Sequence, residues 1–152
     1  MTDYSCLKGK TAFISGASGA IGGAIAESLS NIGVNLVISG TNQERLNKIK
    51  KRLPSNVKVI SGDISEQPEI LRIIDETLSY GRIDILINCA GIFAQNPITE
   101  LNFIEYNKVM NVNLHAPYLL SVELSKNMIK NRWGRIVNIG SASSYAGFKN
   151  TV

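Results

Sequence analysis

A tyrosine and a lysine stand four residues apart near the end of the chain, at Tyr145 and Lys149, just after a serine-rich turn. A tyrosine hydroxyl can give a proton to a carbonyl oxygen, and a nearby lysine lowers the tyrosine pKa from its ordinary value of about 10. Residues at i and i+4 share a face only within a helix. Gly147 lies between the two and costs such a helix roughly 1 kcal/mol relative to alanine. The pair is therefore one hypothesis for a proton-donating site, and a loop is the other.

A second group of residues with chemical potential is the glycine-rich segment Ser15-Gly-Ala-Ser-Gly-Ala-Ile-Gly22. It follows an apolar run and precedes an amphipathic one, which is where a dinucleotide-binding fold needs small residues. Gly16 permits a tight turn, Gly19 lets backbone amides approach a pyrophosphate, and Gly22 lets the helix pack close to the sheet. We predict that the segment contacts a dinucleotide through Gly16, Ala17, Ser18, Gly19, Ile21 and Gly22.

Apolar runs alternate with amphipathic segments along the whole chain. The apolar runs predict five strands, at residues 11–15, 35–39, 57–61, 83–88 and 135–139. Between them the pattern predicts helices from the glycine turn to residues 31–33, then at 43–52, 68–78 and about 103–131. Pro117 lies inside the last helix, so a kink or break is expected there. Gly33 fits the position that ends the first helix.

This alternation predicts an α/β protein of the Rossmann type, with a doubly wound parallel sheet and helices on both faces. The strand order expected for that fold is 3-2-1-4-5. We expect one NAD(P)-binding domain over residues 1–152.

Composition excludes several other classes of protein. Of the 152 residues, 44% are hydrophobic and 18% are charged, which is ordinary for a globular chain. The net charge of +4 comes with no nucleic-acid motif, and the basic run Lys48-Ile-Lys-Lys-Arg52 suits the last turn of a helix. Cys6 and Cys89 lack the spacing of a metal site or a disulfide framework, and no apolar run is long enough to cross a membrane. A cytoplasmic protein without bound metal, nucleic acid or membrane is expected.

The end of the second strand bears on the choice of cofactor. NAD-selective folds place Asp or Glu there to bond the ribose 2′-hydroxyl, but this strand ends Ile38-Ser-Gly-Thr41, and the next acid is Glu44 inside the helix. No carboxylate repels a 2′-phosphate, and Thr41 and Asn42 can donate to one. No arginine stands at this strand end. NADP(H) is therefore favoured over NAD(H).

Four further stretches resemble the short-chain dehydrogenase/reductase family, and the resemblance covers the whole chain. They are Gly62-Asp-Ile64 after the third strand, Asn88-Cys-Ala-Gly91 after the fourth, Val112-Asn-Leu114 in the long helix, and Asn138-Ile-Gly-Ser141 after the fifth. The 3-oxoacyl-acyl-carrier-protein reductases are the most similar branch. The family's usual glycine pattern is Gly-x-x-x-Gly-x-Gly, and here Ala20 stands in place of the middle glycine. The spacing of Gly16, Gly19 and Gly22 looks like that of the extended branch of the family, which includes epimerases, but that branch lacks the Asn88–Gly91 stretch.

The resemblance implies a carbonyl or 3-oxoacyl thioester reductase that uses hydride from NADPH. It implies that Thr41, Asp63, Ile64, Asn88, Ala90 and Gly91 contact the cofactor, and that Ser141 and Asn113 belong to the catalytic site. Taken singly, Asp63 and Ser141 read as turn residues, Asn88 as a loop cap and Asn113 as a buried polar residue. Their joint placement at strand ends favours the functional interpretation. A complete family member is expected to form a homo-oligomer.

The register of the family also bears on Tyr145. Its catalytic Tyr-x-x-x-Lys begins about a dozen residues after the serine, whereas Tyr145 follows Ser141 by four. The expected tyrosine then falls about two residues beyond Val152, so the domain is expected to be incomplete at its C-terminus, with the fifth strand as an exposed edge. A non-catalytic dinucleotide-binding fragment or degenerate gene product is the alternative, and an enzyme that uses Tyr145 and Lys149 in place is a third hypothesis.

Overall fold

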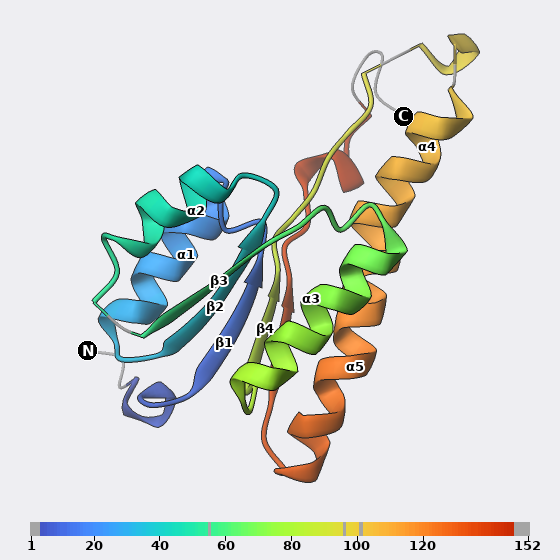
Figure 1. Cartoon of the computed structure of the whole chain (residues 1–152). Coiled ribbons are helices and arrows are strands. Elements are labelled where there is room, and N and C mark those ends of the chain that lie inside the picture. The colour runs from blue at the N-terminus through green and yellow to red at the C-terminus, as the bar shows by residue number, and fades with distance from the viewer. Residues whose placement is uncertain (1–3, 55, 96, 101, 148–152) are drawn as a thin grey trace.

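The computed structural model describes residues 4–54, 56–95, 97–100 and 102–147. Its centre is a five-stranded, fully parallel sheet with the order β3-β2-β1-β4-β5 (Figure 1). The strands are β1 (Thr11–Ser15), β2 (Asn35–Gly40), β3 (Val57–Ser61), β4 (Ile85–Asn88) and β5 (Arg135–Asn138). The predicted fold class and strand order are confirmed.

Helices cover both faces of the sheet (Figure 1). They are α1 (Ala20–Asn31), α2 (Gln43–Lys50), α3 (Gln67–Tyr80), α4 (Phe103–Met110) and α5 (Ala116–Lys130), with short 3-10 turns at Ser5–Leu7, Ile98–Glu100 and Ala142–Ser144. Gly33 follows α1 with a φ of 83°, which is the left-handed conformation predicted for it.

Several predicted element boundaries differ from the structure by one or two residues. The fourth strand begins at Ile85 instead of Ile83. Asp84, just before it, bonds to the first residue of β1 at the edge of the sheet where the strands begin. There its carboxylate accepts a hydrogen bond from the Thr11 amide at 3.0 Å, and its own amide donates to the Thr11 carbonyl at 2.8 Å. The second helix ends at Lys50, two residues before the predicted end.

The predicted long helix is divided by a wide turn. Residues Asn111–His115 form a π-helical turn between α4 and α5, in which the Ala116 amide donates to the carbonyl of Asn111, five residues earlier. Pro117 has no amide hydrogen to give to the carbonyl of Asn113, so the regular i to i−4 pattern cannot pass through this point. The break expected at Pro117 therefore lies in the turn just before it.

The core has two halves, one on each face of the sheet. Phe13, Val37 and Leu86 point to the side of α3 and α5, whereas Ile14 and Ile38 point to the side of α1 and α2. Neighbouring strand residues thus face opposite ways, and both faces are buried, as the nearly continuous apolar strands predict.

The sheet ends at β5, which pairs with β4 alone. All four residues of β5 are exposed, and Ile136 and Val137 each keep 42% of their surface open to solvent. The exposed apolar edge expected for the fifth strand is present. Among the described residues, no helix is long and apolar enough to cross a membrane, and no group of three or more acidic, cysteine or histidine residues is placed to hold a metal.

Candidate functional site

A hollow of about 480 Å³ lies at the carboxyl ends of the central strands. The strand order reverses direction at β1, because β2 and β3 lie on one side of it and β4 and β5 on the other. Open parallel sheets bind their ligands at such a switch point. The hollow is lined by eight of the predicted cofactor residues: Gly16, Ser18, Gly19, Thr41, Asp63, Ile64, Ala90 and Gly91.

The glycine turn forms one wall of this hollow because it lies against the loop after β4. Gly16 has a φ of 69°, and a Cβ there would meet the backbone N and Cα of Ala90 at 2.6 Å. The Ser15 hydroxyl holds the same loop, since its Oγ accepts hydrogen bonds from the amides of Cys89 (3.1 Å) and Ala90 (3.2 Å). A larger residue at position 16 would separate the two loops.

Helix α1 points its N-terminus at the hollow. Gly19 is the N-cap residue, and no side chain caps the end of the helix. A Cβ on Gly22 would meet the Gly16 carbonyl oxygen at 2.5 Å, so the first turn of α1 packs directly on the glycine turn. Ala20 begins the helix with its side chain exposed, where it does not narrow the hollow. The first amides of α1 are therefore open to an anion.

The side next to β2 is closely packed and carries no acidic group. A Cβ on Gly40 would meet the Ser18 Oγ at 2.6 Å, and Thr41 follows at the rim. Asn42 caps α2, because its Oδ1 accepts from the Arg45 amide at 2.9 Å, which leaves its amide nitrogen available as a donor.

The loop after β3 supplies Asp63 and Ile64. The Asp63 Oδ1 accepts a hydrogen bond from the Ser65 amide at 2.9 Å, which is the bond expected of a turn residue. Asp63 also lines the hollow, as expected of a cofactor-binding residue. Arg72 supports this loop from α3 by donating to the Ser61 carbonyl at 2.6 Å while it pairs with Glu69 at 2.8 Å. The Arg72 hydrogen bond lowers the pKa of Glu69.

Four predicted cofactor residues do not line the hollow. Ala17 is fully buried, Gly22 lies beneath the glycine turn, and Ile21 is 60% exposed on α1. Asn88 is buried at the end of β4, where its Nδ2 donates to the Asn138 Oδ1 at 2.8 Å and lies 3.4 Å from the Ser121 Oγ. Asn88 thereby joins β4 to β5 and α5.

Asn113 lies in the π turn and holds the loop after β4. Its Oδ1 accepts from the Ile92 amide at 3.0 Å, and its Nδ2 donates to the Ile92 carbonyl at 2.7 Å. Gly91 is adjacent, since a Cβ there would lie 3.6 Å from the Asn113 Oδ1. Asn113 thus lies beside the hollow, and both polar atoms of its side chain are hydrogen-bonded to the backbone of Ile92.

Ser141 follows β5, the strand next to β4, at the same edge of the sheet. Its Oγ accepts from the Ser143 amide at 3.2 Å and caps a short 3-10 turn. Tyr145 comes after that turn, outside any helix, with 95% of its surface exposed. Lys149 lies outside the described residues, so the structure does not describe the pairing with Tyr145.

Several residues of the hollow were missed by the sequence prediction. They are Ser15, Ser39, Gly40, Gly62, Cys89, Ile92, Lys108 and Val112. Ser15 and Ser39 are polar residues in or at the end of otherwise apolar strands, and this position could have identified them as candidate ligand-binding residues. The helical pattern around Lys108 gives no indication that this side chain reaches the hollow. Burial raises the pKa of the Cys89 thiol.

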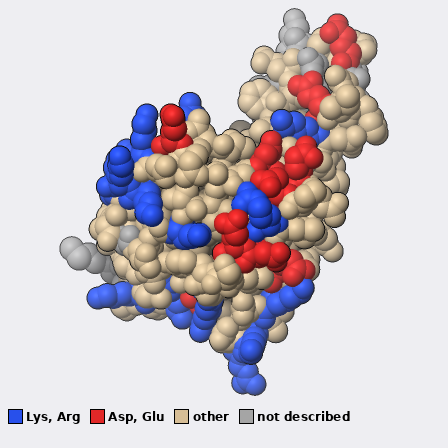
Figure 2. All heavy atoms as spheres, in the orientation of Figure 1, with Lys and Arg blue, Asp and Glu red and all other residues tan. Residues whose placement is uncertain are grey.

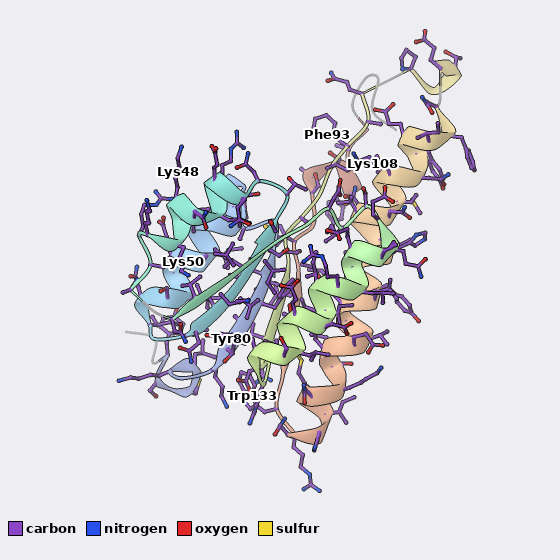
Figure 3. The ribbon with its side chains drawn as sticks, viewed as in Figure 1. Lys48, Lys50, Tyr80, Phe93, Lys108 and Trp133 are labelled. Carbon is purple, nitrogen blue, oxygen red and sulfur yellow. The ribbon has the colours of Figure 1, made fainter. Side chains whose placement is uncertain are left out.

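A second hollow, of about 420 Å³, lies between α1 and α2 and shares Ser18 and Gly19 with the first. Arg45, Lys48 and Arg52 line it together with Glu27. Arg52 pairs with Glu27 at 3.0 Å, whereas among the described residues the charged ends of Arg45 and Lys48 have no acidic partner. Figure 2 shows Lys and Arg side chains gathered around α2, and Figure 3 places Lys48 there and Lys108 on α4.

Comparison with known proteins identifies relatives of the chain. The short chain dehydrogenase family profile matches residues 10–152. A 3-oxoacyl-[acyl-carrier-protein] reductase of Rickettsia conorii is 37% identical over 141 residues, which cover 93% of this chain and 57% of the relative. The chain thus spans little more than half the length of this relative.

Solved structures agree with the fold and include both nicotinamide cofactors. A metagenomic short-chain oxidoreductase in complex with NADP matches with a TM-score of 0.90 and 30% identity, over 97% of this chain and 69% of that one. An NAD⁺-bound xylitol dehydrogenase matches with a TM-score of 0.84 and 26% identity, over 95% of this chain and 57% of that one.

Proposed function

The chain belongs to the short-chain dehydrogenase family, and from this premise we propose that it binds NADP(H) at the carboxyl edge of its sheet and forms the cofactor-binding part of a carbonyl reductase. The observation that carries the proposal is the hollow itself. It joins the uncapped N-terminus of α1 to a glycine turn that has no room for a side chain at Gly16.

The residues present fit a dinucleotide. The open amides at the start of α1, next to Ser18 and Gly19, suit the pyrophosphate. The adenosine half then lies toward β2 and β3, between Thr41 and the pair Asp63–Ile64, because the first strands of such a fold bind that half. The other half extends past Ala90 and Gly91 toward the π turn.

NADP(H) is preferred because of the charges around the 2′ position. No carboxylate stands at the end of β2, and Thr41 offers a hydroxyl. The structure also adds cations that the strand end itself lacks. Arg45 and Lys48 line the hollow that adjoins Ser18 and Gly19, so α2 brings positive charge to the side where a 2′-phosphate would lie.

A titration of the 152-residue chain with NADPH and NADH, followed by nucleotide fluorescence, tests this assignment. We expect Arg45→Ala to weaken NADPH binding about tenfold, as for one charge-assisted hydrogen bond, and to leave NADH binding unchanged. Lys50→Ala is the matched control, because Lys50 lies on the same helix but does not line the hollow. Equal effects of Arg45→Ala on both nucleotides would contradict the role of Arg45, and binding of neither nucleotide to the parent chain would refute the proposed function.

The proposed reaction is reduction of a carbonyl, in particular a 3-oxoacyl thioester as in the Rickettsia relative. The bound reduced nicotinamide would supply the hydride to the carbonyl carbon, and a proton donor, the role that the family resemblance gives to a tyrosine, would protonate the oxygen. We assign Ser141 to orient the carbonyl oxygen, since it follows β5 at the same sheet edge as the hollow. The family resemblance also assigns Asn113 to the catalytic site, where its two bonds to Ile92 fix the loop beside Gly91.

A non-catalytic dinucleotide-binding role is the second candidate, and Tyr145 is the observation that favours it. The side chain of Tyr145 is almost fully exposed and outside any helix, and none of the described residues that line the hollow is a tyrosine. Turnover of a 3-oxoacyl thioester by the 152-residue chain separates the two roles. Binding without turnover supports a binding role for this segment, and turnover abolished by Tyr145→Phe would establish Tyr145 as the donor.

Self-association is part of the proposal. Apolar side chains remain exposed on the long helices, with Ile104 81%, Tyr118 65% and Ile129 74% accessible. Such surface on two consecutive helices is suited to contact with a second copy. The cytoplasmic location stays a prediction from the sequence.

A further inference from the structure

The π turn fastens two loops of the hollow at once. Asn113 bonds both backbone groups of Ile92, in the loop after β4. Asn111, two residues earlier in the same turn, points to the other loop, where its Nδ2 donates to the carbonyl oxygen of Ser65 at 2.9 Å. Ser65 lies 46 residues earlier in the chain and follows β3. Two asparagines therefore connect one turn to the loops that follow two different strands.

The Ser65 end of this connection leads directly to the hollow. Ser65 is buried, with 4% of its surface exposed, and its amide donates to the Asp63 Oδ1 at 2.9 Å. Asp63 and Ile64 line the hollow, whereas Asn111 and Ser65 do not. Asn111 therefore acts on the hollow only through the backbone that presents Asp63 and Ile64.

The outer side of Asn111 is held by His115. The ring Nδ1 of His115 lies 2.9 Å from the Asn111 Oδ1. An amide oxygen can only accept, so the ring donates from Nδ1, as both the Nδ1-protonated neutral ring and the imidazolium can. This contact turns the amide group of Asn111 toward Ser65, and the donor that the Ser65 carbonyl needs is fixed in place.

We propose that Asn111 is a positioning residue for the adenosine half of the cofactor. It holds the Asp63–Ser65 segment against the π turn, so that Asp63 and Ile64 stay in the wall of the hollow. The inference rests on the proposed function, because it takes the hollow to be the dinucleotide site. It adds that the π turn, which carries Asn113, also sets the affinity for adenosine.

The test measures binding of 2′,5′-ADP, a probe with only the adenosine half, and of NADPH to the 152-residue chain. Asn111→Asp keeps the shape of the side chain and the acceptor for His115 but removes the donor to Ser65. We expect it to weaken both ligands about tenfold, the effect of one lost hydrogen bond to a buried carbonyl. His115→Ala leaves that bond in place, and we expect a smaller loss. Asn107→Asp, one turn earlier on α4 with an exposed side chain, is the control and should leave affinity unchanged.

The thermal midpoint of each ligand-free variant is measured alongside, and Asn111→Ala serves as a second variant. Loss of affinity in Asn111→Asp with a midpoint within a few degrees of the parent supports positioning. Parental affinity in a folded Asn111→Asp or Asn111→Ala chain overturns it. If the parent chain binds neither 2′,5′-ADP nor NADPH, the proposed function fails and the inference fails with it. If the parent binds both and the Asn111 variants bind equally well, the inference alone fails.

Discussion

Four glycines allow backbone strain and steric clash to be measured separately. Gly9 and Gly16 both have positive φ, 77° and 69°, but a Cβ on Gly9 meets nothing within 4 Å, whereas one on Gly16 meets the backbone of Ala90 at 2.6 Å. Gly22 and Gly23 are both helical. A Cβ on Gly22 meets backbone atoms at 2.5–2.9 Å, whereas one on Gly23 first meets the tip of a flexible side chain at 3.4 Å. Each pair differs chiefly in the clash.

The expected magnitudes follow from this geometry. Alanine in the left-handed region costs about 1–2 kcal/mol, which is the whole effect expected at Gly9. A forced clash adds about 1–3 kcal/mol, so Gly16→Ala should lose about 2–5 kcal/mol of a total stability of about 5–15 kcal/mol. In the helix, alanine gains up to about 1 kcal/mol over glycine. Gly23→Ala should therefore stabilise slightly, and Gly22→Ala should be less stable than Gly23→Ala by about 1–3 kcal/mol.

Urea unfolding followed by circular dichroism gives the four free energies of unfolding, and thermal midpoints should shift by about 2–4 °C per kcal/mol. The decisive quantity is the difference within each pair. If Gly16→Ala unfolds at the same urea concentration as Gly9→Ala, the glycine turn does not lie against the β4 loop as described. The wall of the hollow would then have to be placed differently.

Two further predictions concern titrating groups. Burial raises the pKa of Cys89, which lines the hollow, so in a Cys6→Ser chain this thiol should react slowly with iodoacetamide near neutral pH and faster as the pH rises. Bound NADPH should slow the reaction, which mass spectrometry measures. If NADPH gives no protection, the nucleotide binds elsewhere. Because Arg72 lowers the pKa of Glu69, the folded-state pKa lies below the unfolded one, so this stabilisation is present above the unfolded pKa of about 4.3 and is lost as pH falls through the folded value. Urea midpoints of the parent and Glu69→Gln should converge in that acidic range, and a constant difference down to pH 2 would contradict the pairing.

The fold could be predicted from the sequence because its signals are local and repeated. Both faces of the central strands are buried, so runs such as Ala12–Ile14 are apolar throughout, and each is followed by a turn and an amphipathic helix. Parallel pairing then follows from the connections. The eight predicted cofactor residues that line the hollow all lie within four residues of a strand end. Gly16, Ser18 and Gly19 were predicted from the glycine-rich segment after the first strand, and the other five from the family resemblance.

The remaining features depend on distances between segments far apart in the chain. Asn88 stands at a strand end like the others, but its amide points toward Asn138 instead of the hollow, and this direction is set by β5, fifty residues later. Arg45 on α2 lines the second hollow and Lys108 on α4 lines the first. The apolar periodicity of a helix predicts which residues face the core, but not which polar residues face a ligand. The π turn was expected only as a kink, because the sequence shows Pro117 but not the two loops that the turn binds.

The proposed cofactor site and the proposed catalytic serine follow strands that differ in burial. The glycine turn leaves β1, which is hydrogen-bonded to β2 on one side and β4 on the other and has fully buried side chains such as Phe13 and Ile14. Ser141 leaves β5, which has one neighbouring strand and exposed residues along its length. Segments with few buried contacts open at lower free energy than core strands. The proposed nucleotide site is therefore built on the well-buried centre of the sheet, whereas Ser141, the proposed catalytic residue, follows a strand whose residues are exposed.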